Sequence, residues 1–192
     1  MKKKLFANIL LVCGILLVLG AMGIFLNMQC TQKKADRQIG GYVEQLKESM
    51  PEITDAFAEE RQDVSMSMME IDGNDFVGIL EVPFCGIEFP IGSSWEKKQL
   101  IQYPCRYWGS AYDGSLVIGG SDRKGQFDFM DEISIGDCIY FTDMTGAKYS
   151  YVVSWVERVK EVPTQYLENE NVGLTIFVRN QYGFDYTVVR CE

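Results

Sequence analysis

The first hydrophobic feature of the sequence is a continuous apolar run near the N-terminus. The run covers residues 5–26, and Asn8 is its only strongly polar residue. As a helix it would extend about 33 Å, enough to cross a hydrocarbon core of about 30 Å. Lysines precede it, and basic residues keep their side of a membrane helix in the cytoplasm. We therefore expect a basic cytoplasmic stub over residues 1–4, a transmembrane anchor over 5–28 and an extracytoplasmic remainder.

The alternative for this run is a signal peptide cleaved near Ala21. The apolar part of a signal peptide has about 7–15 residues. The run is longer than that and stays apolar beyond Ala21, so the anchor is the favoured interpretation.

The segment that follows is polar and helix-favouring, and it predicts an extracytoplasmic helical linker over residues 29–70. Its apolar residues recur at alternating steps of four and three, which makes one stripe on a helix. The stripe consists of Ile39, Val43, Leu46, Met50, Ile53 and Phe57. Proline is tolerated in the first turn of a helix, so Pro51 predicts two helices that meet near Met50. We expect the stripe to pack on the following domain, and the alternative is pairing with another molecule.

From residue 76 onward the pattern changes to short β segments separated by turn residues. The expected strands cover residues 76–82, 87–91, 115–119, 138–142, 148–159, 174–178 and 186–191. Short helical pieces are expected over 95–102, 126–133 and 164–169, with a hairpin turn over 143–146. These elements predict a mainly β domain over residues 71–192. A closed barrel or a sandwich is favoured, because closure removes exposed edges.

Charge and composition exclude several functions. Histidine is absent, which removes every mechanism that needs an imidazole base or an imidazole metal ligand. The first 34 residues carry five lysines and no acid. The remainder of the chain therefore has 13 basic and 27 acidic side chains, a net charge of −14. An acidic domain repels nucleic acid and anionic wall polymers, so we expect neither as a general partner.

The six cysteines form no CxxC pair and show no zinc spacing. They are Cys13, Cys30, Cys85, Cys105, Cys138 and Cys191. We expect no metal and no cofactor. Buried free thiols are the default expectation for the four cysteines of the β domain, although disulfides are permitted outside the cytoplasm and the sequence does not pair them.

Several segments in order resemble one known family. They are "NDFVGILEVP" (74–83), "YPCRYWGS" (103–110), "LVIGG" (116–120), "IGDCIYFTD" (135–143), "LTIF" (174–177) and "VVRCE" (188–192). In order and spacing they are similar to a class B type sortase over roughly residues 70–192. The resemblance implies a closed barrel of about eight strands with short helices, preceded by N-terminal helices and one transmembrane helix. It also implies a cysteine transpeptidase of Gram-positive cell surfaces.

Sortases use a cysteine nucleophile, a histidine that exchanges protons and an arginine that stabilises the oxyanion. Carried over by position, the resemblance places Ser121 where the histidine belongs, Arg179 where the cysteine belongs and Tyr186 where the arginine belongs. An arginine cannot form an acyl intermediate, and a serine hydroxyl does not exchange protons near neutral pH. Arg190 lies four residues beyond Tyr186, about 13 Å along a strand, so we expect it to be structural.

These substitutions predict a membrane-anchored, extracytoplasmic protein of the sortase family that has lost transpeptidase activity and acts as a binding or accessory module. Its groove would take a peptide or protein partner, and Arg179 is the candidate residue to hold a carboxylate or a C-terminus. Arg179 could instead point to solvent or pair with a local acid. The alternative function is an active sortase with displaced catalytic residues. A third is an architectural role in which the stripe assembles with a membrane partner.

Overall fold

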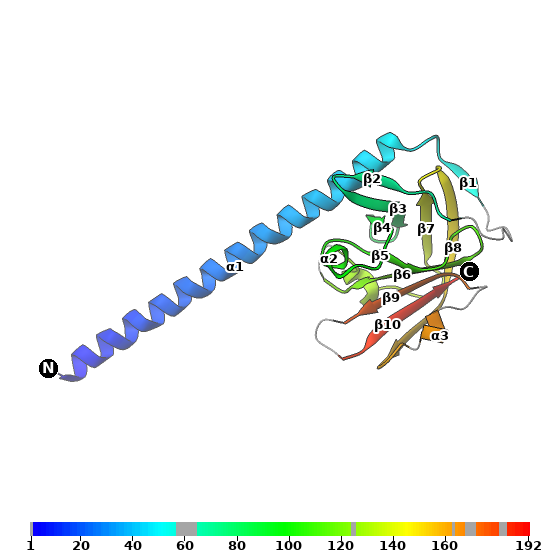
Figure 1. The fold of residues 1–192 in the computed structure, drawn as a ribbon. Helices are drawn as coiled ribbons and strands as arrows, with labels where there is room; N and C mark the ends of the chain where they lie inside the picture. Colours follow the sequence, from blue (N-terminus) through cyan, green and yellow to red (C-terminus); the bar gives the residue numbers. More distant parts are fainter. Residues whose placement is uncertain (1, 57–64, 124–125, 163, 168–171, 181–183) are drawn as a thin grey trace. The chain divides into compact units, whose positions relative to one another are not determined.

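The computed structural model describes residues 2–56, 65–123, 126–162, 164–167, 172–180 and 184–192. The side chains of 2–12, 23, 25–36 and 165–166 lie outside this description. The chain divides into two compact units, residues 1–37 and 38–192. The first unit is helical from Lys2 onward, as part of α1 (Lys2–Ser49) (Figure 1).

A membrane anchor was expected over residues 5–28. Within the described part of the chain, no helix combines the length and apolarity that are required to cross a membrane. Many side chains of the expected anchor lie outside the described set. The anchor therefore stays a prediction.

The second unit contains a closed β-barrel (Figure 1). Following the pairing from strand to strand returns to its start after eight described strands. In order around the barrel these are β3 (Asn74–Val82), β4 (Ile87–Gly92), β5 (Cys105–Trp108), β6 (Ser115–Ser121), β9 (Gly173–Arg179), β10 (Tyr186–Cys191), β8 (Ala147–Val159) and β7 (Cys138–Asp143). The β4–β5 and β6–β9 pairs are parallel, and the others are antiparallel. The predicted mainly β fold is thus a barrel and not a sandwich.

The seven predicted strands are confirmed, each to within two residues at either end. Three strands were not predicted: β5 and two short strands, β1 (Thr54–Ala56) on the edge of β8 and β2 (Met69–Ile71) beside β3. The expected helical pieces contain α2 (Lys97–Leu100), the 3-10 helix η1 (Asp128–Asp131) and α3 (Thr164–Leu167). The turn over 143–146 is confirmed, because Asp143 Oδ1 accepts from the backbone N–H groups of Thr145 and Ala147 at 2.8 and 2.9 Å.

Two helices were expected to meet near Met50, and the second of them is not found: residues 54–56 form a strand. The first helix ends at Ser49, but Thr54 then begins a strand, and its N–H donates to the Gly146 carbonyl at 2.9 Å. Pairing with β8 supplies backbone hydrogen bonds that a short isolated helix would have to make alone, so the strand forms instead. Phe57, the last residue of the predicted stripe, lies outside the described residues.

The part of the stripe on α1 packs on the barrel, as expected, whereas Ile53 is exposed. Tyr42, Val43 and Leu46 of α1 form a buried cluster with residues of β3 and β5, and Leu46 is fully buried. The barrel residues of the cluster are Phe76, Ile79, Tyr103, Cys105 and Met144. Lys47 also forms an ion pair with Glu88 at the start of β4. The larger apolar cluster fills the barrel with inward-facing residues such as Leu80, Ile118 and Ile176.

Candidate functional site

The ends of three neighbouring strands bring Ser121, Arg179 and Tyr186 into one line. The Cα atoms of Ser121 and Arg179 are partners in the β6–β9 register, and those of Arg179 and Tyr186 are partners between β9 and β10. Side chains alternate between the two faces of a strand. Val178 and Val189 point into the barrel core, so the three residues share the outer face. We call this line the row.

Ser121 is held by a small polar network. Its hydroxyl donates to the buried Oε1 of Gln126 at 3.3 Å and accepts from Arg123 Nε at 3.1 Å. Gln126 in turn donates to the Leu100 carbonyl at 3.4 Å. The serine therefore fixes the loop after β6 against the C-terminal end of α2, which is a structural role for this position.

The glycine pair before Ser121 is required by aromatic rings on both sides of β6. A Cβ on Gly119 would lie 2.4 Å from Trp95 Cζ3 and 2.6 Å from Phe177 Cζ, on the outer face. A Cβ on Gly120 would lie 2.8 Å from the Phe127 ring, on the inner face. Because the two glycines have no side chains, the aromatic rings pack directly against the backbone of β6.

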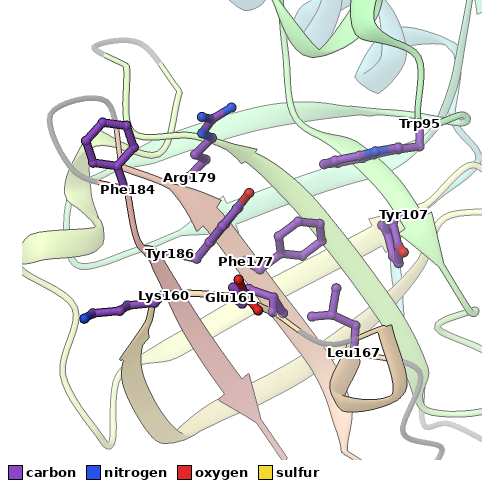
Figure 2. A pocket seen from close by; sticks show the side chains of 10 residues that line it. Trp95, Tyr107, Lys160, Glu161, Leu167, Phe177, Arg179, Phe184 and Tyr186 are labelled. Carbon is purple, nitrogen blue, oxygen red and sulfur yellow. The ribbon is translucent and has the colours of Figure 1, made fainter.

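A groove of about 380 Å³ lies beside the row (Figure 2). It is lined by Trp95, Tyr107, Lys160, Glu161, Val162, Leu167, Phe177, Arg179, Phe184 and Tyr186. Figure 2 shows the groove's two halves: Trp95, Tyr107 and Phe177 gather at one end, while Arg179 and Phe184 lie toward the other. The volume falls in the range of small-molecule and peptide subsites, about 300–1,000 Å³.

The aromatic end of the groove is a packed triangle of three rings. The ring centroids of Trp95, Tyr107 and Phe177 lie 5.2–5.3 Å apart, and two of the three contacts are edge-to-face. Phe177 is nearly buried, whereas Trp95 remains 40% exposed. The triangle therefore offers a packed apolar surface on which Trp95 is the most exposed large hydrophobic residue.

The polar end of the groove holds groups whose hydrogen-bonding capacity is unused. Over the described residues, Arg179 forms no ion pair and no hydrogen bond, and the same holds for the Tyr186 hydroxyl and the Lys160 ammonium. Arg179 is exposed and lines the groove. The two alternatives for Arg179 were exposure to solvent and pairing with a local acid. The side chain is exposed, and it pairs with none of the described acids.

None of the described cysteines lines the groove. Cys105 and Cys191 are fully buried, and burial raises the pKa of each thiol to about 12. Cys85 is half-buried, and desolvation, with smaller contributions from Asp128 and Glu132, raises its pKa as well. Cys138 is exposed, contrary to the expectation of a buried thiol, because it starts β7 with its side chain on the outer face. All five described cysteines are free thiols.

The other candidate residues do not approach the row. Arg190 pairs in register with Thr175, four residues before Arg179 on β9, which places it about 13 Å along the strands from Tyr186. Among the described residues, no group of three or more Cys, Asp or Glu side chains is arranged to hold a metal ion.

Sequence reasoning missed most of the groove. Trp95, Tyr107, Lys160 and Phe184 come from loops and a short strand, and no local pattern marks them as neighbours. Phe177 was predicted only as part of a strand. The available signal was the alternation along β9, which puts Phe177 on the same face as Arg179.

No family model matches the sequence, and no curated protein matches it. Solved structures do match. Sortase A from Listeria monocytogenes aligns with a TM-score of 0.53 at 17% identity, over 61% of this chain and 86% of the other. Sortase A from Corynebacterium diphtheriae gives 0.55 at 18% identity, over 62% of this chain. Clostridium perfringens sortase C, in a structure with the C-terminal cell wall sorting motif, gives 0.54 at 19%, over 62% and 70%.

These likenesses show that the chain has the sortase fold. The chain spans only 60% of the C. diphtheriae protein. The matched structures named above are sortases A and C, so the resemblance of the sequence segments to class B stays a prediction.

Proposed function

We propose that this chain is a sortase-fold protein without cysteine transpeptidase chemistry, and that its groove binds an extended peptide or a segment of a partner protein. The observation that carries the proposal is the row. At the ends of β6, β9 and β10, where the resemblance places histidine, cysteine and arginine, stand Ser121, Arg179 and Tyr186. These side chains supply no nucleophilic thiolate and no proton-exchanging base near neutral pH.

The chemistry of the remaining thiols supports the same conclusion. A displaced nucleophile would have to reach the groove and be ionised near neutral pH. Cys105 and Cys191 fail on both counts, because they are buried and a pKa of about 12 leaves almost no thiolate. Cys85 and Cys138 lie outside the groove lining. An active sortase with displaced residues therefore has no candidate cysteine nucleophile among the described groove residues.

We also propose that the domain is extracytoplasmic and anchored by the apolar run over residues 5–28. The support is the length of that run and the lysines before it. The architectural alternative loses its main support, since Leu46 and its neighbours on the stripe are covered by the barrel.

The test compares the wild-type chain with a repaired variant. Full-length protein is incubated with peptides that carry cell wall sorting motifs and with an amine acceptor, and intact-mass spectrometry looks for an acyl adduct or a transfer product. The repaired variant carries Ser121→His, Arg179→Cys and Tyr186→Arg. Its control has Arg179→Ala with the other two changes, and circular dichroism verifies the fold of each variant.

We expect no adduct on the wild type or on the control, and an adduct on the repaired variant alone. Product or adduct from the wild type overturns the proposal and identifies a displaced nucleophile. Binding is measured with the same peptides by titration. A wild type that binds neither these peptides nor the acidic ones described below contradicts the binding role.

A further inference from the structure

The groove has two chemically different ends at a fixed separation. Phe177 and Arg179 are two residues apart on β9 and face the same side, so their Cα atoms are separated by about 6.6 Å. An extended peptide repeats the side chains of one face at the same interval. A ligand that lies along this strand therefore presents one side chain to the aromatic triangle and the next on that face to Arg179.

The polar end is suited to a carboxylate. Among the described residues, nothing bonds to the guanidinium of Arg179 or to the hydroxyl of Tyr186, its register partner. A carboxylate accepts two parallel bonds from a guanidinium and still has lone pairs for a hydroxyl. Lys160 adds a second cation to the groove lining. Glu161 is the acid in that lining, and it forms no ion pair with either cation.

Charge adds selectivity to this arrangement. Residues 35–192 have a net charge of −14, so most of the surface repels acidic ligands. Arg179 and Lys160 against Glu161 leave the groove lining with one net positive charge, which is a local departure from the domain's charge. An acidic peptide is attracted to this groove and repelled by the rest of the surface, which restricts its binding to this site.

The aromatic end is suited to an apolar side chain. Trp95 and Phe177 rest on Gly119, and the exposed part of the Trp95 ring is the accessible surface of the triangle. Burial of a leucine-sized side chain against such a surface contributes without requiring a hydrogen bond. It also fixes the ligand's register along β9.

We propose that the groove selects an extended peptide in which a carboxylate lies two residues from an apolar side chain, with the carboxylate on Arg179 and Tyr186 and the apolar side chain on Trp95 and Phe177. This inference rests on the proposed binding function and specifies its ligand. The carboxylate comes from an acidic side chain or from the end of a polypeptide, and the experiment separates these sources.

The experiment measures binding of fluorescent pentapeptides to the full-length chain by anisotropy. The test peptide is Ala-Leu-Ala-Glu-Ala with both ends blocked, and its isostere has glutamine in place of glutamate. A third peptide, Ala-Ala-Leu-Ala-Gln with a free C-terminal carboxylate, carries the alternative source of charge. Arg179→Gln is the variant at the polar end, and Arg158→Gln, which removes an exposed arginine from β8, is the matched control.

We expect the glutamate peptide to bind at least about tenfold more tightly than its glutamine isostere, as a charge-assisted pair supports. Arg179→Gln should abolish that preference, and Arg158→Gln should keep it. Trp95→Ala should weaken both peptides. Tighter binding of the third peptide than of the glutamate peptide would assign the carboxylate to a polypeptide end.

Two results would overturn the inference in different ways. If the glutamate and glutamine peptides bind equally well, and Trp95→Ala weakens both, the carboxylate preference is wrong while the binding groove stands. If no peptide binds, including those with sorting motifs, both the inference and the proposed function fail. Arg179 is exposed, so its variant removes no packing, whereas Trp95→Ala also removes ring contacts with Tyr107 and Phe177 and its fold is verified by circular dichroism.

Discussion

Ser121 and Arg179 lie side by side at the ends of two parallel strands, as partners in the β6–β9 register. Ser121 is committed to Gln126 and Arg123, whereas Arg179 forms no hydrogen bond with the described residues. One member of the pair thus stabilises the loop after β6, and the other remains available to a ligand. Under the proposed binding function, Arg179 is therefore the member of the pair that meets the ligand.

The packing of Trp95 on Gly119 can be tested with two alanine substitutions. In Gly119→Ala the new Cβ meets the far ends of the Trp95 and Phe177 rings, and Trp95 can move because it is partly exposed. In Gly78→Ala the Cβ meets the Thr142 carbonyl oxygen at 2.5 Å and the Phe141 ring inside the barrel wall. We expect Gly78→Ala to cost about 1–3 kcal/mol of unfolding free energy and Gly119→Ala clearly less.

The readouts for this pair are chemical denaturation and tryptophan fluorescence. Gly119→Ala should shift the emission to longer wavelength, since displaced Trp95 becomes more hydrated. Equal losses of stability without a shift would contradict the contact between Trp95 and β6.

The contact of α1 with the barrel predicts a large effect at Leu46. This side chain is fully buried among Tyr42, Phe76 and Tyr103. Leu46→Ala should lower the unfolding free energy by about 2–5 kcal/mol, through lost burial and a residual cavity. Ile53→Ala, at a side chain 49% exposed, should change it by less than about 0.5 kcal/mol. Similar small effects from both would mean that the helix does not pack as described.

Alkaline pH should weaken the fold through Cys191. Burial raises the pKa of this thiol to about 12, while an unfolded thiol titrates near about 8.5. Between these values the unfolded chain has lost the proton and the folded chain has kept it. The unfolding free energy therefore falls as pH rises, by up to about 1.4 kcal/mol per pH unit for this group, and the contribution is fully present below pH of about 8.5.

The measurement is the slope of unfolding free energy between pH 8.5 and 10. Cys191→Ala should make the slope shallower than in the wild type. Val189→Ala, which shortens another inward-facing residue of β10 without removing a titrating group, should leave it unchanged. An identical slope in all three proteins would show that the thiol ionises equally in both states.

The exposed Cys138 thiol gives a test of location. If the barrel is extracytoplasmic, a membrane-impermeant maleimide added to intact cells should label Cys138 in a chain that carries Cys30→Ala and Cys85→Ala, and the further change Cys138→Ala should remove that label. Buried Cys105 and Cys191 should stay unlabelled until the protein is unfolded. Labelling of Cys138 only after lysis would place the domain in the cytoplasm and contradict the proposed topology.

Most barrel strands were predictable because each has a face buried in the core, and a buried face requires apolar residues at alternating or consecutive positions of the sequence. Strand β5 was not predicted, because its four residues do not form an apolar or alternating pattern and only Cys105 is fully buried. β1 and β2 have three residues each, and pairing with a neighbouring strand determines them more than their own composition. Local patterns carry no information about such pairing.

The row and the groove differ in the same respect. The positions of the row could be predicted from the sequence, because Ser121, Arg179 and Tyr186 lie at the ends of recognisable strands. Their expected chemical roles came only from the resemblance. Trp95 contacts Phe177, which is far along the chain, from a polar loop. Such loop-to-strand contacts depend on the closed barrel, so the aromatic end of the groove could not be foreseen.

The parallel pairing of β6 with β9 has a consequence for the order in which the molecule folds. Phe177 lies on the groove floor, and its register partner Gly119 is 58 residues earlier in the chain, with the β7–β8 hairpin between them. Joining such distant segments carries a loop-closure entropy that local hairpins avoid, and it slows folding. We therefore expect the groove floor to assemble late, after the hairpins have formed. Ligand capture would then distinguish fully folded chains from partly folded ones.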